Sequence, residues 1–294
     1  MSLAHGRKGY GFGRAAVDHD GWLGAEEVGE ELRRVFGAPG YHPPMLPKVA
    51  LEVHELVKRP DVGIPEVVTV LEHDAMLAAE VLRVAASPAY ATQMPPRSLQ
   101  DAAARLGLSG LRDVVWQVAM GRVFRVAGYE RTLDQLRRHS AAVAILTRFV
   151  ASHTSVAMEY GFLFGLLHDV GHMAMIHALA ERGASPPDLG ALAVELDAYH
   201  CEAGEIVARL WGLPVELQWM IGAHRHPDLG GYRHPVIACQ CLAHYIADQS
   251  GRGAGLPGQH DTVSPHAVDV ALAELRLSER DLARLAEQGR ALLE

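Results

Sequence analysis

Apolar residues that recur every three or four positions dominate this chain from about Leu23 onward, and the apolar-polar alternation typical of strands is nearly absent. This repeat places apolar side chains on one face of a helix. We therefore expect an all-α protein. Helices are predicted within residues 46–124 and at about 25–36, 131–151, 158–180, 187–211 with a break, 214–226, 235–249 and 278–293.

Several helix starts are marked by residues that cap free backbone amides. Asp74, Ser98 and Ser109 each precede an apolar-periodic segment, and Pro65 fits the first turn of another helix. The Gly- and Pro-rich segment at 250–265 predicts a loop or linker. We predict an N-terminal extension with one helix (1–37), an N-terminal helical lobe (38–128), a second lobe (129–250), and a linker with a helical tail (251–294).

Composition excludes some classes of function. The formal net charge is −8, whereas a DNA-binding protein needs clustered lysine and arginine to neutralise phosphates. The N-terminus lacks the apolar stretch of a signal peptide, and no uncharged apolar run of membrane-spanning length occurs. We therefore expect a cytoplasmic protein that binds neither DNA nor a membrane. Its three cysteines are too few for a disulfide framework and are interpreted as buried thiols.

Ionisable residues lie on the apolar stripes of several predicted helices. With its 17 histidines, the chain is rich in the commonest metal ligand. A lone histidine on an apolar face is more often a core residue with one hydrogen bond than a ligand. Two buried carboxylates, however, are costly unless they are paired or coordinated. The inward-facing residues are His139, His168, Asp169, His224 and Asp248. Their combination favours a shared metal site, while the direction of His200, near a predicted helix break, is left open.

The same residues resemble those of a known family. His139, the pair His168-Asp169 within GLLHDVG, and Asp248 within YIAD match the H…HD…D signature of the HD superfamily of metal-dependent phosphohydrolases. The stretches MLPKVALEVHELVKRPDVGIPEVVTVLEHDAMLAAEVLRVAASPAYA and SLQDAAARLGLSGLRDVV resemble, more specifically, the HDOD domain of bacterial signalling proteins. The resemblance covers roughly residues 40–250. It implies an HD-like helical bundle with an N-terminal helical lobe and a role in signal transduction.

The resemblance also implies roles for individual residues. Most HDOD proteins have lost the metal-binding residues, but this chain retains them. His139, His168, Asp169 and Asp248 are predicted to hold one divalent metal, with His200 and His224 available for a second. Iron or manganese is favoured if both positions exist, and nickel, zinc or magnesium is also compatible with imidazole and carboxylate ligands.

Related HD-GYP cyclic di-GMP phosphodiesterases differ from this chain at defined positions. His224 matches the first histidine of their paired motif, but Arg225 replaces the second, and the segment 230–235, GGYRHP, only loosely resembles their GYP sequence. His172 stands where they carry lysine. Arginine cannot ligate a metal, so Arg225 is predicted to hold a phosphate of a bound nucleotide. If hydrolysis occurs, Asp169 and His172 are the catalytic candidates, with His172 as acid, base or further ligand.

A weaker motif lies near the N-terminus. Residues 16–27, AVDHDGWLGAEE, resemble a calcium loop of the EF-hand type, with Asp18, Asp20, Gly21 and Glu27 at the third, fifth, sixth and twelfth positions. The first ligand position is alanine and no helix precedes it. An ordinary acidic turn that caps the following helix is therefore favoured over calcium binding.

Three functions remain open from the sequence. A non-catalytic signalling module that contacts a signalling protein in trans, and a nucleotide, is favoured. The alternatives are a metal-dependent phosphohydrolase or cyclic dinucleotide phosphodiesterase, and a scaffold whose histidines are only structural. A homodimer is compatible with each of them.

Overall fold

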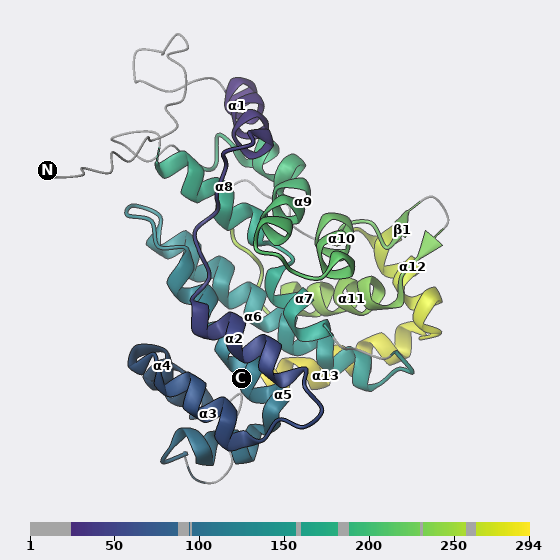
Figure 1. Ribbon diagram of the computed structural model, residues 1–294. Helices are drawn as coiled ribbons and strands as arrows, with labels where there is room; N and C mark the ends of the chain where they lie inside the picture. The colour runs from purple at the N-terminus through teal and green to yellow at the C-terminus, as the bar shows by residue number, and fades with distance from the viewer. Residues whose placement is uncertain are drawn as a thin grey trace, which may run out of the picture.

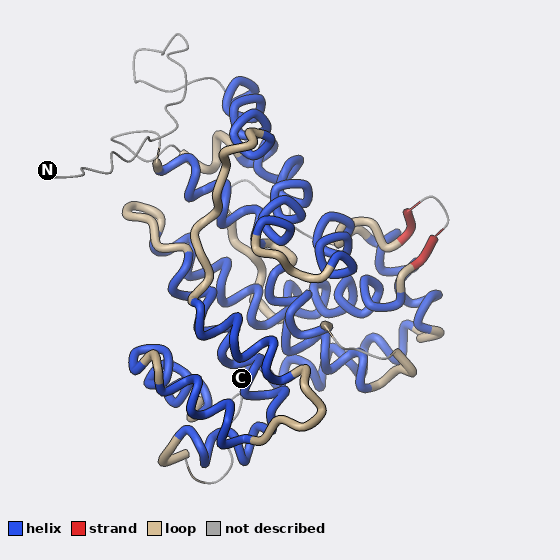
Figure 2. Tube along the Cα trace, viewed as in Figure 1, coloured by secondary structure: helices blue, strands red, loops and turns tan. Residues whose placement is uncertain are grey.

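The computed structural model describes residues 25–87, 94, 96–156, 160–181, 188–229, 232–256 and 263–294, and these residues are mostly helical (Figures 1 and 2). The helices are α1 (Ala25–Gly37), α2 (Lys48–Val57), α3 (Ile64–Glu72), α4 (Ala75–Ala85), α5 (Leu99–Val123), α6 (Glu130–Ser152), α7 (Gly161–Leu167), α8 (Val170–Ala180), α9 (Ala193–Leu210), α10 (Val215–Ala223), α11 (Pro235–Gln249), α12 (Pro265–Leu275) and α13 (Glu279–Leu293). A two-residue antiparallel pair, β1 (Asp228–Leu229) with β2 (Tyr232–Arg233), connects α10 to α11. The prediction of an all-α chain is confirmed.

The N-terminal lobe consists of α2 to α5, which bury one face each in a common core. Asp74 caps α4 by accepting a hydrogen bond from the Leu77 amide (2.9 Å), and Ser98 caps α5 through the Asp101 amide (3.0 Å). Both predicted caps are confirmed. A new helix was expected to start at Ser109, but α5 instead continues through this residue and is kinked at Gly107. The φ of Gly107, 69°, lies in the left-handed region that glycine adopts without steric cost.

A buried carboxylate joins this lobe to the next one. Asp113 in α5 is 2% exposed and accepts hydrogen bonds from Arg112 Nη2 (2.9 Å) and from Arg148 Nη1 of α6 (2.9 Å). Burial raises the pKa of Asp113, although both guanidinium groups favour its charged form. Removing either arginine would leave the carboxylate less compensated, so this triad holds the two lobes in register.

The second lobe is built around α6, α7 and α11, which lie side by side in the middle of the molecule (Figure 1). Helix α8 packs on α9, which in turn contacts α10 and α1. By length and composition, the segment Gly161–Ala180 could cross a membrane. However, 94% of its 18-residue apolar window is buried inside the fold. Its apolar character is therefore accounted for by its place in the core.

The C-terminal helices pack onto the same lobe. Helices α12 and α13 contact α11 and α6 around a second core that includes Leu146, Ile246, Ala271 and Leu285. The sequence predicted one tail helix at 278–293, which corresponds to α13. Helix α12 was not predicted, although Ser264 caps it by accepting from the Ala267 amide (3.2 Å) and Pro265 occupies its first turn. Ser264 and Pro265 end the Gly- and Pro-rich segment at 250–265, which was predicted to be a loop, so the helix start at these two residues was not predicted.

One buried histidine in the N-terminal lobe makes stability depend on pH. Trp116 Nε1 donates a 3.2 Å hydrogen bond to His54 Nδ1, and His54 is 3% exposed. Burial lowers the pKa of His54 to about 4. The unfolded chain takes up a proton near pH 6.5, whereas the folded protein resists protonation until about pH 4. This contribution to stability is therefore complete above pH 6.5 and is lost as the pH falls toward 4.

We expect His54→Asn to flatten this dependence, because the asparagine oxygen can still accept from Trp116 but does not titrate. Between pH 7 and pH 5 the variant should lose about 2 kcal/mol less unfolding free energy than the wild type. Urea unfolding of both proteins at the two pH values measures this difference, and the contribution of all other histidines cancels in it. Equal losses in the two proteins would contradict the assignment.

Candidate metal centre

Seven buried ionisable side chains converge in the second lobe, and each of them is at most 3% exposed. They are His139 in α6, His168 and Asp169 at the junction of α7 and α8, His172 in the first turn of α8, His200 in α9, His224 at the end of α10, and His244 in α11. Six helices therefore contribute to one polar cluster inside an apolar core.

Two glycines that flank the HD pair allow the helices to approach closely enough. A Cβ atom at Gly165 would lie 2.6 Å from the Cα of Ala144 in α6, and one at Gly171 would lie 1.9 Å from the carbonyl oxygen of His200 in α9. Such contacts are far inside van der Waals distance. The GLLHDVG segment can thus carry its histidine and aspartate to the meeting point of α6 and α9 only because it begins and ends with glycine.

Asp169 lies at the centre of the cluster, and its two oxygens face different histidines. Oδ2 is 3.2 Å from His168 Nε2 and 3.6 Å from His139 Nε2. Oδ1 is 3.6 Å from both His172 Nδ1 and His224 Nε2, and 3.9 Å from His200 Nε2. The carboxylate therefore sits between two sets of imidazole nitrogens.

Hydrogen bonds to the backbone orient four of the imidazoles. The Nδ1 atoms lie within 2.6–2.8 Å of main-chain carbonyl oxygens: His139 with Arg252, His168 with Gly165, His200 with Asp197, and His224 with Ile221. A carbonyl can only accept, so each Nδ1 carries the proton and each neutral ring presents an unprotonated Nε2. This is the arrangement that fixes the tautomer of metal-binding histidines.

The Nε2 atoms of the histidines face one another in pairs. His139 Nε2 is 3.3 Å from His168 Nε2, and His200 Nε2 is 3.2 Å from His224 Nε2. Neither oxygen of Asp169 accepts a hydrogen bond of good geometry from the described residues, and His244 Nε2 also has no such partner among them. Imidazole nitrogens that converge on a buried carboxylate are a donor set that a divalent cation would satisfy, so the residues present fit a metal.

The electrostatics agree with neutral ligands around an ionised acid. Burial lowers the pKa of His139 to about 4 and that of His224 to about 3, and it holds the pKa values of His200 and His244 well below the ordinary one. Burial alone would raise the pKa of Asp169, but the adjacent His168 and His172 lower it well below its usual range. Burial thus disfavours the charged forms of His139, His200, His224 and His244, so these four imidazoles offer neutral nitrogens beside the ionised Asp169, as metal binding requires.

Ligand atoms close enough to share an ion fall into overlapping groups. One comprises His139, His168 and His244, another Asp169, His172 and His200, and within each group all ligand atoms lie within 4.8 Å of one another. Cys201 adds a sulfur 3.4 Å from His200 Nε2, but burial raises the pKa of this thiol to about 12. The first group lies on the Oδ2 side of Asp169 and the second on the Oδ1 side, so the site offers two adjacent positions.

Six of the residues singled out in the sequence meet in this cluster: His139, His168, Asp169, His172, His200 and His224. His244 also lies in the cluster but was not singled out in the sequence, although its spacing from Cys241 and Asp248 already placed it on the inward stripe of α11. Asp248, predicted as a direct ligand, lies one turn beyond it, with Oδ2 3.7 Å from His244 Nε2. His244 rather than Asp248 groups with His139 and His168.

Arg225 lies at the edge of the cluster, next in sequence to His224. Its Nη2 forms a 2.8 Å ion pair with Asp197 Oδ1, and its side chain is 22% exposed. Its phosphate-binding role stays a prediction. The residues at 16–24 of the predicted calcium motif, and Gly230 and Gly231 of the GGYRHP segment, lie outside the described residues.

Comparison with known proteins identifies the family. The HDOD domain family matches residues 44–227, which is more than half of the chain and includes His139, the HD pair, His200 and His224. The chain belongs to the HDOD domain family. The resemblance inferred from the sequence is thereby confirmed, although the match ends before His244 and Asp248.

Individual relatives of this HDOD protein agree with the assignment. An uncharacterised protein of Treponema pallidum (strain Nichols) is 25% identical over 212 residues, which are 68% of this chain but only 41% of that protein. The chain thus spans less than half the length of this relative. A crystal structure of an HDOD domain protein of unknown function from Geobacter sulfurreducens is 24% identical, with a TM-score of 0.68 over 91% of this chain and 98% of that one.

Two further solved structures share the fold. One, from Shewanella amazonensis SB2B, is described as a proposed metal-dependent phosphohydrolase and is 20% identical, with a TM-score of 0.67 over 92% of this chain and 99% of that one. The other, from Marinobacter aquaeolei VT8, is described as a proposed signal transduction protein and is also 20% identical, with a TM-score of 0.62 over 92% of this chain and 64% of that one. At such identities the likeness shows the all-helical fold alone.

Proposed function

We propose that this HDOD protein is a signal-transduction output module that holds two divalent metal ions and acts by binding a partner in trans. The observation that carries the proposal is the central carboxylate of Asp169, fully buried between two sets of imidazoles. A solvent-free cluster of this kind is costly without cations. A non-catalytic role is supported by the enclosure of all seven residues, since a substrate needs an open coordination position that it can reach.

Each metal would have its own nitrogen ligands and share the aspartate. His139, His168 and His244 would hold one ion, His172, His200 and His224 the other, and Asp169 would contact both. Six imidazoles and one carboxylate suit iron, zinc or nickel better than magnesium, which prefers oxygen ligands. We propose iron, with zinc or nickel as the next candidates. When bound, the metals would compensate the charge of Asp169 and join the helices that surround it.

A metal-dependent phosphohydrolase is the second candidate. It is favoured by the shared carboxylate, because two ions held side by side can act as Lewis acids on one phosphoryl group. In that case Asp169 and His172 would position the reacting groups. The full burial of both residues weighs against this alternative.

Metal content tests the first proposal. Protein purified without a metal-affinity tag is expected to contain about two equivalents of metal per chain by plasma mass spectrometry, and less than roughly 0.1 equivalent would refute the metal assignment. Turnover separates the two candidates. We expect metal-loaded protein to hydrolyse cyclic di-GMP and bis(p-nitrophenyl) phosphate no faster than His168→Ala. Hydrolysis that disappears in this variant would favour the phosphohydrolase.

A further inference from the structure

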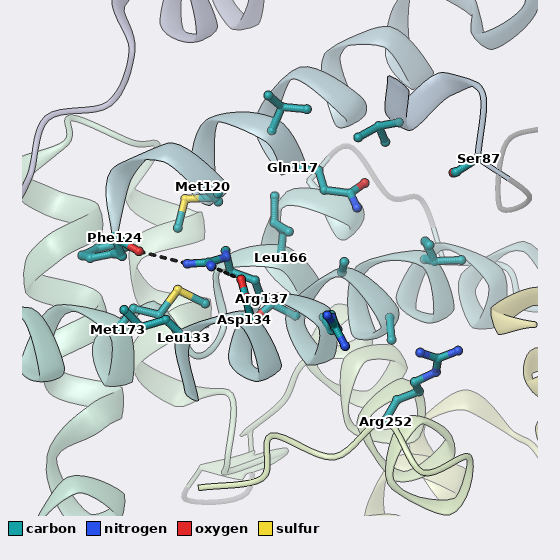
Figure 3. Close-up of a pocket in the computed structure, with 18 of the residues that line it drawn as sticks. Ser87, Gln117, Met120, Phe124, Leu133, Asp134, Arg137, Leu166, Met173 and Arg252 are labelled. Atoms are coloured by element: carbon teal, nitrogen blue, oxygen red, sulfur yellow. Dashed lines mark hydrogen bonds and ion pairs between the residues drawn. The ribbon is translucent and has the colours of Figure 1, made fainter. Parts of the chain in front are cut away.

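A large cavity lies where the N-terminal lobe meets α6, away from the seven metal-facing residues. It has a volume of about 760 Å³ and is walled by α4, α5, α6, the loop after α11 and the end of α13 (Figure 3). In Figure 3, Gln117 of α5 and Arg252 of that loop lie on opposite sides of the space. The volume falls within the range of small-molecule sites rather than of protein-docking surfaces.

A second, smaller cavity continues from the first. It has a volume of about 570 Å³ and shares Asp134, Arg138 and Arg252 with the larger one. Arg131 and His139 also line it, so the smaller cavity reaches the outer side of the metal centre. Arg131 and Arg138 are seven residues apart in α6, a spacing that places both on one face of the helix.

The arginines around this smaller cavity are not neutralised. Among the described residues, no carboxylate lies within 4.0 Å of a guanidinium nitrogen of Arg131, Arg138 or Arg252. Asp134, the acidic residue that lines the smaller cavity, is already paired with Arg137, whose Nη1 also donates to the Phe124 carbonyl (2.9 Å; Figure 3). Arg252 Nη2 donates to the Leu293 carbonyl (2.8 Å), which leaves its charge without a paired carboxylate. In a chain of net charge −8, three arginines without a carboxylate partner on one cavity form a local site for an anion.

The larger cavity has a mixed surface. Val84, Met120, Ile145 and Leu166 contribute apolar side chains to its wall, and Gln117 contributes an amide. Charged side chains of both signs also line it: Glu80, Arg83, Arg125, Glu130 and Glu294. A ligand that spans both cavities would therefore place an anionic group on the arginines and an apolar, hydrogen-bonding group between α5 and α6. Guanidinium groups bind phosphate through paired N–H donors, and a nucleobase is an apolar group that also forms hydrogen bonds.

We propose that this pair of cavities binds a nucleotide, with its phosphate on Arg131, Arg138 and Arg252 and its base between α5 and α6. The proposal deepens the function proposed above, because it names a ligand for the module. It assigns the phosphate to these three residues rather than to Arg225, which is paired with Asp197. Arg252 also connects the cavity to the metal centre, since its carbonyl accepts from His139 Nδ1 (2.7 Å).

Calorimetric titration of AMP and GMP into the full, metal-loaded chain tests the proposal. At least one nucleotide is expected to bind, and Arg131→Gln or Arg138→Gln should each weaken it by roughly 10-fold or more, as expected for the loss of a charged hydrogen bond. The matched control is Arg209→Gln, which removes an exposed arginine of α9 that lines neither cavity. It should change the affinity by less than about twofold.

Further titrations test the phosphate contacts and the base contacts separately. Adenosine and guanosine should bind at least roughly 10-fold more weakly than their phosphates, and inorganic phosphate should bind more weakly than either nucleotide. No binding at millimolar nucleotide, or binding unchanged in both arginine variants, would overturn the proposal. Metal content is measured on the same batches. Nucleotide binding that survives metal removal would support the nucleotide site even if the metal assignment fails. Binding that is abolished by metal removal but not by the arginine variants would refute the nucleotide site.

Discussion

Asp169→Asn is expected to lower stability strongly in the metal-loaded protein and only slightly in the metal-free protein. Asparagine keeps the size of the side chain but removes the charge that faces both sets of histidines. Metal-loaded wild type should unfold at a higher temperature than the variant treated in the same way, because ligands that bind only the folded state stabilise it. When the free metal concentration is about 1,000-fold above its dissociation constant, metal binding stabilises the folded state by about 4 kcal/mol.

After removal of metal the difference between the two proteins should become small. The wild-type carboxylate is then fully buried with only the neighbouring histidines to compensate its charge, whereas the neutral amide can donate to an imidazole nitrogen that faces it. Thermal unfolding with and without chelator, together with metal analysis of each sample, measures both effects. Asp197→Asn serves as the control because its side chain is 48% exposed and pairs only at the edge of the cluster. A variant that keeps its metal and its melting temperature would show that Asp169 is not the shared ligand.

Gly171→Ala is expected to be strongly destabilising, although alanine is the better helix former. Intrinsic propensity favours alanine within α8 by about 1 kcal/mol. The added methyl group, however, would lie 1.9 Å from the carbonyl oxygen of His200 and 2.8 Å from the amide nitrogen of Gly204, both of which are backbone atoms that no side-chain rotation can move. Helices α8 and α9 would have to separate. We expect a net loss of about 3 kcal/mol or more, with weakened metal binding because His200 moves with α9.

A second glycine provides the matched comparison. Gly121→Ala in α5 would place its methyl group 4.0 Å from the nearest atom, Arg137 Cδ, which is ordinary contact. This substitution is expected to raise the free energy of unfolding by about 0.5–1 kcal/mol. Chemical denaturation of both variants gives the signs directly. A Gly171→Ala protein as stable as Gly121→Ala would show that the close approach of α8 and α9 is not required.

The metal-facing residues could be predicted largely because helical periodicity reports which side of a helix is buried. His139 and His224 each follow apolar residues at spacings of three, four or seven, and both are inside the cluster. The same logic was incomplete for α11, where His244 and Asp248 lie one turn apart on one stripe. Periodicity assigns both to the inward face but says nothing of depth along the helix axis, so the choice between them depends on where α11 crosses α6.

The sequence by itself determined the helical class, the capping of α4 and α5, the family, and the inward direction of His139, His168 and His224, because these follow from local spacing and from residue type. Only the tertiary structure decided that Asp169 stands between two sets of imidazoles, that His244 joins one of them, and that arginines from α6 and the loop after α11 line one cavity beside His139. Such relations join residues up to 113 positions apart, as in the contact of His139 with Arg252. They depend on how closely helices pack, which the flanking glycines permit but do not by themselves specify.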